Sequence, residues 1–354
     1  MDAVAQIQDR VRAAAADGMQ LCIRGGDSKA FYGGARHGEL LDTRAHTGIV
    51  QYEPSELVVT VRAGTPLVEL EAVLAEKRQM LAFEPPHFGA ATVGGMVAAG
   101  LSGPRRATSG AVRDHLLGVR LIDGRGDSMR FGGEVMKNVA GYDVSRLMAG
   151  AMGTLGVLTE VSLKVLPMPA AEHAIGFSMN RPDALRAMNR WACQPLPISA
   201  TCWHADTLHI RLSGAVAAVE AAMRNLGGEA VDDAVAGQLW TSVREQTHPF
   251  FAGGDDALWR VSLCSAEENL ILDLPMLIEW GGALRWVRAP AGDARVRAEA
   301  HRQHGFATRF RTPGGGQGSA FEQLAGPLAE IHRRIKQAFD PAGIFNPLSL
   351  PAIH

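Results

Sequence analysis

The sequence predicts an α+β fold made of two domains, and three observations lead to this prediction. At 354 residues the chain is long enough for two hydrophobic cores. Segments with a helical apolar period occur beside segments in which apolar residues alternate. Pro167 and Pro169 end one alternating segment, and glycine becomes sparser beyond them. We therefore expect a domain boundary at these prolines.

Most elements of the first domain follow from apolar spacing. Residues 4–11 have the spacing of a helix that Gly18 ends, and residues 21–23 predict a strand that runs into the loop 24–29. Thr65 and Pro66 are expected to be the N-cap and the first residue of a helix. Further strands are expected at 56–63, 117–121, 129–131 and 157–165.

The second domain is expected to contain an antiparallel sheet with helices on one face, because helical and alternating segments take turns there. Residues 311–319 (RTPGGGQGS) predict a flexible loop, and residues 327–339 predict a last amphipathic helix. The other helices are expected at 182–192, 215–225 and 294–304, and the strands at 207–212 and 258–263.

Composition narrows the range of functions. A net charge of −2, with 20% charged residues, gives no reason to expect nucleic acid or an anionic membrane as a partner. The longest apolar runs, such as 93–101, are broken by glycine and too short to span a membrane. Residues 1–20 lack the pattern of a signal peptide, so a cytoplasmic location is expected. The four cysteines form no Cys-x-x-Cys pair, so neither a zinc site nor an iron–sulfur site is expected.

Residues 21–29 (LCIRGGDSK) raise the question of what their glycine loop holds. Paired glycines let consecutive backbone N–H groups point into one concavity that binds phosphate, although such residues also form ordinary turns. The P-loop motif and the Gly-x-Gly-x-x-Gly pattern of Rossmann domains are both absent. Residues 84–156 place further glycines inside apolar segments, which indicates either close helix-on-sheet packing or a large planar cofactor. These glycines are Gly94, Gly95, Gly100, Gly103, Gly110, Gly141, Gly150, Gly153 and Gly156.

Together these segments resemble a known superfamily. Residues 24–29, 92–95, 109–114 and 153–159 resemble the PCMH-type FAD-binding domain of the vanillyl-alcohol oxidase superfamily. Residues 137–143 (KNVAGYD) resemble its branch that oxidises D-2-hydroxy acids. Phrases along nearly the whole chain, among them EPPHFG, SGPRR, WGGALRWV, FATRF and DPAGIFNP, resemble the FAD-binding E subunit of bacterial glycolate oxidase.

The resemblance implies a domain plan and an activity. A two-subdomain FAD-binding domain would span residues 1–169, and an α+β cap domain for the substrate would span 170–325. Residues 326–354 would return to the FAD-binding domain. The expected activity is oxidation of glycolate, a small 2-hydroxy acid, to glyoxylate, with electrons passed through the flavin to an iron–sulfur partner of F type. A D-type flavoprotein subunit is the other expected partner, and contact with the inner membrane is expected only through partners.

The resemblance also implies which residues bind FAD. Arg24, Gly25, Gly26, Asp27, Ser28 and Lys29 would form the pyrophosphate loop, and Asn346 would reach the polar edge of the flavin. Asp27 stands where relatives with covalently tethered FAD often have histidine, so non-covalent FAD is expected, with the Asp27 carboxylate capping a backbone N–H. The other expected contacts are Thr92, Gly94 and Gly95 in the groove, Ser109, Gly110 and Val112 along the pyrophosphate and flavin ring, and Gly153, Gly156 and Val157 at the adenosine.

A flavin 2-hydroxy-acid dehydrogenase needs a cation for the substrate carboxylate and a base for the hydroxyl proton. The candidate cations are Arg260, Arg285 and Arg309. The candidate bases are His87, His115, His301 and His304. Residues 305–309 (GFATR) correspond to a metal-ligating Gly-Asp-Gly-Asn-x-His motif of the D subunit but lack its ligands, so no metal is expected.

The missing motif leaves open whether this subunit oxidises glycolate itself or relays electrons. Two alternatives also stay open: a stand-alone FAD-dependent D-lactate or D-2-hydroxy-acid dehydrogenase, and a non-catalytic scaffold subunit with structural FAD. Four aromatic residues are expected to be either core residues or anchors of a partner interface. They are Phe250, Phe251, Trp280 and Trp286.

Overall fold

The computed structural model describes residues 3–34, 37–133, 142–252, 254–266, 273–314 and 320–347. Three sequence-based expectations fall partly outside these residues. They are residues 137–141 of the KNVAGYD phrase, which include Gly141, residues 315–319 of the glycine loop, and residues 348–354 of the C-terminal segment.

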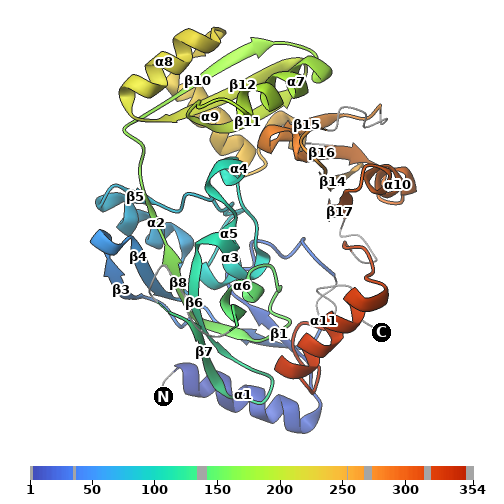
Figure 1. Ribbon diagram of the computed structural model, residues 1–354. Coiled ribbons are helices and arrows are strands. Elements are labelled where there is room, and N and C mark those ends of the chain that lie inside the picture. Colours follow the sequence, from blue (N-terminus) through green and yellow to red (C-terminus); the bar gives the residue numbers. More distant parts are fainter. Residues whose placement is uncertain are drawn as a thin grey trace.

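A five-stranded antiparallel sheet carries the main core of the first domain, in the lower half of Figure 1. Its strand order is β3-β4-β8-β6-β7. The helices α2 (Leu67–Glu76) and α3 (Val93–Ala99) pack their apolar side chains against it. The strands are β3 (Ile49–Glu53), β4 (Val58–Arg62), β6 (Leu116–Ile122), β7 (Ser128–Gly132) and β8 (Val157–Lys164). The short helices α4 (Arg106–Ser109), α5 (Val112–His115) and α6 (Val144–Met148) lie in the connections.

A parallel strand pair forms the second part of this domain. Strand β1 (Leu21–Arg24) pairs with β2 (Glu39–Asp42), and α1 (Ala3–Asp17) shares their apolar core. The last described segment enters the same core through Phe345, which bridges Leu21. It is preceded by α11 (Gly326–Phe339), which Figure 1 shows in red beside the lower domain. The C-terminal residues therefore complete the part of the fold that the N-terminal residues begin.

The expected helix start at Thr65 is wrong in its capping chemistry. Helix α2 begins at Leu67, and no side chain caps it. The Thr65 hydroxyl oxygen instead accepts a hydrogen bond from the backbone N–H of Gly48 at 2.9 Å. A tertiary contact therefore uses the oxygen that a local cap would have used. The other expected helices and strands are present within a few residues of their expected ends.

An eight-stranded antiparallel sheet forms the second domain, in the upper half of Figure 1. The chain reaches it after the small pair of β5 (Gln79–Met80) and β9 (Leu166–Pro167). The order is β13-β10-β12-β11-β15-β16-β14-β17, so strands far apart in sequence become neighbours. The strands are β10 (Ala171–Ser178), β11 (Ile198–His204), β12 (Thr207–Gly214), β13 (Glu229–Val231), β14 (Ala257–Ser262), β15 (Met276–Glu279), β16 (Leu284–Ala289) and β17 (Phe306–Arg311).

Helices cover both faces of this sheet, so the expectation of helices on one face is wrong. Helices α7 (Arg181–Ala192), α8 (Val216–Leu226) and α10 (Ala294–Arg302) pack on one face. Helix α9 (Asp233–Arg244) packs on the other, where Tyr32 of the first domain joins the same core. That second face is also apolar and needs cover from both α9 and the first domain. The four aromatic residues considered as partner anchors are all buried in this interdomain core.

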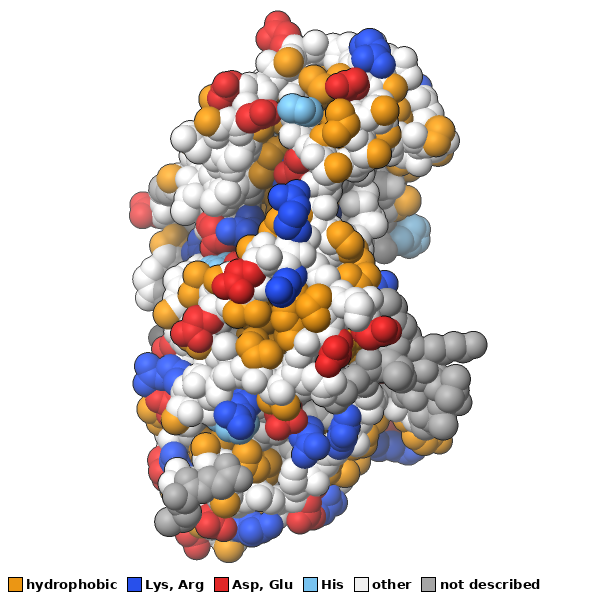
Figure 2. Space-filling model, turned by 90° about the vertical axis from the view of Figure 1, so that its left-hand side faces the viewer, with side chains coloured by type: hydrophobic (Ala, Val, Ile, Leu, Met, Phe, Trp, Pro, Cys, Tyr) orange, Lys and Arg blue, Asp and Glu red, His pale blue; other side chains and the backbone are white. Residues whose placement is uncertain are grey.

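The face shown in Figure 2 carries no large patch of charges of one sign. Acidic and basic side chains are interspersed there, with apolar side chains gathered near the middle. Among the described residues, no helix is long and apolar enough to cross a membrane.

Candidate functional site

A cavity opens in the first domain where β1, the start of α3 and the segment 151–158 meet. It encloses about 960 Å³ of space when its open mouth is counted. The sequence-predicted residues that line it are Arg24, Gly25, Gly26, Asp27, Ser28, Lys29, Thr92, Gly94, Gly95, Gly153, Gly156 and Asn346. The fold thus brings together segments separated by more than three hundred positions.

The paired glycines allow the loop to lie directly against the start of α3. A Cβ on Gly26 would overlap the backbone carbonyl oxygen of Ala90, and a Cβ on Gly25 would overlap the hydroxyl of Thr92. That hydroxyl is engaged as the N-cap of α3, where it accepts a hydrogen bond from the Gly95 N–H at 3.2 Å. Close packing therefore accounts for both glycines, whatever the loop binds.

The same loop contains backbone N–H groups that are not hydrogen-bonded within the described part of the chain. Within the described part of the chain, the backbone N–H groups of Gly25, Gly26 and Ser28 have no acceptor. Unpaired backbone donors that line a cavity can bind the oxygens of a phosphate. Asp27 has a φ of 59°, and its carboxylate lies 3.5 Å from the Arg24 Nε, which offsets its negative charge. The expected N–H cap by Asp27 stays a prediction.

Lys29 gives this wall of the cavity a buried cation. Its ammonium donates hydrogen bonds to the hydroxyl of Ser28 at 3.3 Å and to the carbonyl of His87 at 3.1 Å, and it lies over the Phe88 ring. Burial lowers the pKa of Lys29 to about 8, and the negative charge of Glu245 opposes this shift. A phosphate next to Lys29 would favour its charged form.

Asn346 holds the opposite wall together. Its side-chain oxygen accepts a hydrogen bond from the Ile23 N–H at 2.8 Å, and its amide donates to the Met152 carbonyl at 2.7 Å. Gly153 next to it has a φ of 72°, and a Cβ there would press on the Asn346 amide. Asn346 therefore joins β1 to the 152–153 turn at the cavity wall, and its expected contact with the flavin stays a prediction.

Four expected FAD contacts lie outside the cavity lining. The Ser109 hydroxyl donates to the Ala82 carbonyl at 2.8 Å, and Gly110 follows α4 with a φ of 92°. Val112 and Val157 are fully buried in the cores of the first domain. Their expected roles remain predictions, and the structure accounts for all four through packing or a turn.

The candidate bases occupy structural positions. The imidazole of His87 contacts Glu71 at 2.9 Å, and that of His301 contacts Glu322 at 2.6 Å. Both ring nitrogens of buried His115 contact backbone carbonyls. His304 follows α10 with a φ of 55°, and α10 packs on the sheet face away from the first domain.

Among the candidate arginines, Arg260 lies at the interdomain face. Arg285 is completely buried and donates to the Gly282 carbonyl, while Arg309 donates to the Ala291 carbonyl at 3.3 Å. Arg260 is half-buried, and its guanidinium carbon lies 5.2 Å from the centre of the Trp280 ring. A second arginine, which sequence reasoning missed, shares this ring: the guanidinium carbon of Arg106 lies 4.5 Å from its centre.

Glu279 is enclosed in the same interdomain core. Its carboxylate accepts a hydrogen bond from the Trp286 indole N–H at 2.7 Å. Burial raises the pKa of Glu279 from 4.5 to about 7, and the Trp286 hydrogen bond and the Arg260 charge oppose that shift. The Glu279 carboxyl group therefore loses its proton and becomes negatively charged only near neutral pH.

Changing Glu279 to glutamine is expected to remove a pH dependence of stability. Because its pKa is raised on folding, the contribution of Glu279 is fully present below about pH 4.5 and is lost as pH rises through about 7. The glutamine oxygen can still accept from Trp286, so E279Q should exceed the wild type by about 1–3 kcal/mol at about pH 8 and by little at about pH 4.5. Urea unfolding at both pH values measures this, and a pH-independent difference would contradict the raised pKa.

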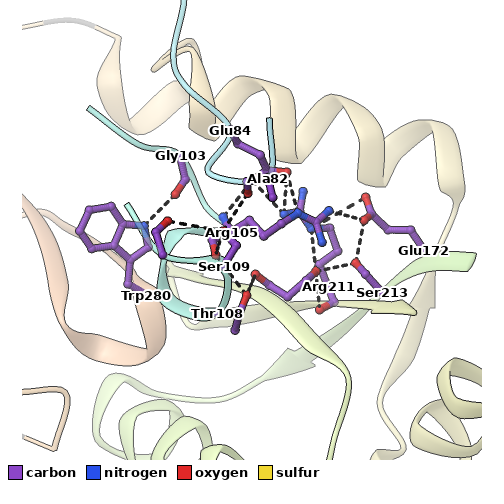
Figure 3. A network of polar contacts seen from close by, with 12 residues as sticks. Ala82, Glu84, Gly103, Arg105, Thr108, Ser109, Glu172, Arg211, Ser213 and Trp280 are labelled. Atoms are coloured by element: carbon purple, nitrogen blue, oxygen red, sulfur yellow. Dashed lines mark hydrogen bonds and ion pairs between the residues drawn. The ribbon is translucent and has the colours of Figure 1, made fainter. Parts of the chain in front are cut away.

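A partly buried network of charges joins the two domains, with both arginines buried. Glu84 and Arg105 come from the first domain, and Glu172 and Arg211 come from β10 and β12 of the second. In Figure 3 the two guanidinium groups lie between the two carboxylates. Arg105 contacts Glu172 at 2.6 Å, and Arg211 contacts Glu84 at 2.8 Å, so each ion pair crosses the interface. The Trp280 indole forms a further hydrogen bond between the domains, because its N–H donates to the Gly103 carbonyl at 3.0 Å.

Comparison with known proteins identifies the family. Residues 2–132 match the family model described as FAD binding domain. The chain is 50% identical over 342 residues to the glycolate oxidase subunit GlcE of Escherichia coli (strain K12), an alignment that covers 96% of this chain and 95% of that one. The chain belongs to the GlcE family. Its cofactor is FAD, as the resemblance implied, and relatives of this family are FAD-linked oxidoreductases.

Other relatives match a smaller part of this GlcE-family chain. The glycolate oxidase subunit GlcD of Bacillus subtilis (strain 168) is 31% identical over 127 residues, which is 36% of this chain and 27% of that one. A D-lactate dehydrogenase of Anaerostipes hadrus is 37% identical over 121 residues, or 34% of this chain and 25% of that one. A solved alkyldihydroxyacetonephosphate synthase structure matches with a TM-score of 0.69 at 14% identity, over 97% of this chain and 74% of that one. It shows the fold alone, and it confirms the expected α+β class of PCMH type.

Proposed function

We propose that this chain is the FAD-carrying subunit of a glycolate (2-hydroxy-acid) dehydrogenase complex that oxidises glycolate to glyoxylate. The observation that carries the proposal is the cavity at residues 24–29, which faces the second domain through Tyr32, in a chain of the GlcE family. A cofactor in this cavity would lie next to the interdomain core. The substrate would enter between the two domains.

The residues around the cavity fit FAD. The unpaired N–H groups of Gly25, Gly26 and Ser28 would bind pyrophosphate oxygens, and the ammonium of Lys29 would offset the phosphate charge. Asp27 offers no imidazole for a covalent link, so the cofactor would be held non-covalently. Bound FAD would supply an acceptor for the hydride on C2 of the hydroxy acid.

The proposal includes two partner subunits, a D-type flavoprotein and an F-type iron–sulfur protein. The cysteines of this chain are Cys22, Cys193, Cys202 and Cys264, whose spacing does not suit an iron–sulfur cluster. Electrons from the flavin would therefore pass to a partner that carries such clusters. Contact with the inner membrane would come through these partners.

The absorption spectrum of the purified chain, before and after acid precipitation, tests the cofactor site. We expect a flavin band that moves to the supernatant on precipitation. A yellow pellet would contradict the non-covalent link expected from Asp27. A colourless protein that does not bind added FAD would overturn the proposal and favour a scaffold subunit.

Dye reduction by glycolate tests the role of the subunit. The FAD-loaded chain is expected to reduce an artificial dye slowly or not at all alone, and rapidly after the D-type and F-type subunits are added. Rapid turnover of D-lactate or glycolate by the single chain would instead identify a stand-alone dehydrogenase. Binding of FAD with no gain from the partners would contradict the proposed complex.

A further inference from the structure

Two arginines from different domains share one indole ring at the interdomain face. Arg106 begins α4 in the first domain, and Arg260 lies on β14 in the second. Their guanidinium carbons lie 4.5 Å and 5.2 Å from the centre of the Trp280 ring. The hydrogen bond from the Trp280 indole to the Gly103 carbonyl holds this ring in place. The fold therefore forces two cations toward one rigid surface.

The two cations lack a matching negative charge. Within the described residues, neither Arg106 nor Arg260 forms an ion pair, although both are half-buried. Elsewhere at this interface, Arg105 and Arg211 are each paired with carboxylates at 2.6–2.8 Å. An indole face attracts a cation but leaves its charge uncompensated. An anion from outside the chain would therefore stabilise these two neighbouring half-buried cations.

The charged groups around the pair do not supply that anion. Burial and the charge of Arg260 lower the pKa of Arg106, while Asp114 acts against this shift and Arg113 adds to it. Asp114 is engaged by the Ala111 N–H at 2.8 Å. Glu279 acts on Arg260 from inside the core, but its carboxylate accepts the Trp286 indole N–H, and with a pKa of about 7 it carries only part of a negative charge near neutral pH.

One member of the pair, Arg260, also lies within electrostatic reach of Tyr32, which lines the cavity. Tyr32 and Ala99 line the cavity and belong to the same packed core as Trp280. The positive charge of Arg260 acts on the Tyr32 phenol and lowers its pKa against the larger effect of burial, which raises it. Strand alternation explains why Arg260 faces this way: Leu258, two residues before it, belongs to the interdomain core, and Trp259 belongs to the core on the other face.

From this arrangement we infer that Arg106 and Arg260 form a carboxylate-binding site, closed across the domain interface, for the small 2-hydroxy acid. This inference rests on the proposed function. A planar guanidinium group can bind a carboxylate through two parallel hydrogen bonds, and two such groups from different domains can hold it from two sides. The site joins substrate binding to the contact between the domains, because each domain contributes one arginine.

Direct binding of glycolate to the FAD-loaded chain tests the inference without turnover. Isothermal titration with glycolate and quenching of tryptophan fluorescence are expected to report one site in the wild type. We expect R106Q and R260Q each to raise the glycolate Kd at least tenfold with the FAD content unchanged. R260K keeps the charge but loses the planar fork, so an intermediate increase is expected.

Arg190 provides the matched control. It is an exposed arginine on α7 whose guanidinium carbon lies 5.8 Å from the Trp191 ring centre, so R190Q removes an arginine–tryptophan contact away from the interface. Its glycolate Kd should stay within twofold of the wild type.

Three results would overturn the inference. They are glycolate binding that is unchanged in both R106Q and R260Q, no glycolate binding by the FAD-loaded wild type, and equally tight binding of inorganic phosphate. The last would indicate a general anion site. Each leaves the proposed function standing if FAD is bound, whereas loss of FAD from the wild type would remove the proposed function itself.

Discussion

Replacing Gly26 by alanine is expected to abolish FAD binding and to destabilise the first domain by about 3 kcal/mol or more. The added methyl group would overlap the backbone carbonyl oxygen of Ala90, which cannot rotate away as a flexible side chain can. The loop 24–29 would have to move away from the start of α3. Its N–H groups would then no longer converge with Thr92 and Gly95 on the cavity.

Two measurements and one control separate this effect from a general intolerance of alanine. FAD content after purification reports the cavity, and urea unfolding reports stability. The control is G237A: Gly237 is exposed on α9, and a Cβ there would meet nothing within 4 Å. Because alanine is favoured over glycine in a helix, G237A should be neutral or stabilise by up to about 1 kcal/mol. Normal FAD content in G26A would contradict the described packing of the loop.

Replacing Arg211 by methionine is expected to destabilise the protein by about 3–5 kcal/mol. The Arg211 side chain is only 4% exposed, and it contacts Glu84, Glu172 and the Ser199 hydroxyl. Methionine fills similar space but leaves the half-buried Glu84 carboxylate and the more exposed Glu172 carboxylate with Arg105 alone. The loss of stability therefore comes mainly from uncompensated charge.

A second change tests that explanation. Adding E84Q to R211M removes the Glu84 carboxylate charge that has lost its Arg211 partner. The double variant should therefore be more stable than R211M alone. The control is R224M, because the Arg224 side chain is 71% exposed and 4.0 Å from Glu220, and its loss should cost about 0–1 kcal/mol. A loss of stability in R211M no larger than that in R224M would show that the network contributes little to domain contact.

Local sequence rules were sufficient for the strongly periodic elements. The alternation at 157–165 is β8, and the amphipathic segment 327–339 is α11. The same rules did not indicate α3, whose segment VGGMVAA contains two glycines that disfavour a helix. Gly94 is there because a Cβ would press on Ala63, so the packing of α3 against β4 overrides local propensity.

The candidate site likewise contains some residues that the sequence indicated and others that only the structure revealed. The glycine loop 24–29 and Asn346 could be expected from the sequence, because the resemblance includes them and they stand in short, specific phrases. The role of Arg106 could not, although the phrase SGPRR contains it, because its partner Trp280 lies 174 positions later and on another domain. The half-buried Glu84 and the buried Arg211 likewise look like ordinary surface residues until their partners across the interface are known.

The sequence by itself determined the α+β class, most periodic elements, the FAD cofactor and the loop that meets the cavity. These depend on apolar spacing and on contiguous phrases, which a linear sequence records directly. Only the tertiary structure decided that α9 and the first domain share one face of the eight-stranded sheet, that Thr65 anchors Gly48 rather than capping α2, and which arginines lack a counter-charge. Burial and charge compensation depend on residues brought together from distant positions, so they exist only once the chain is folded.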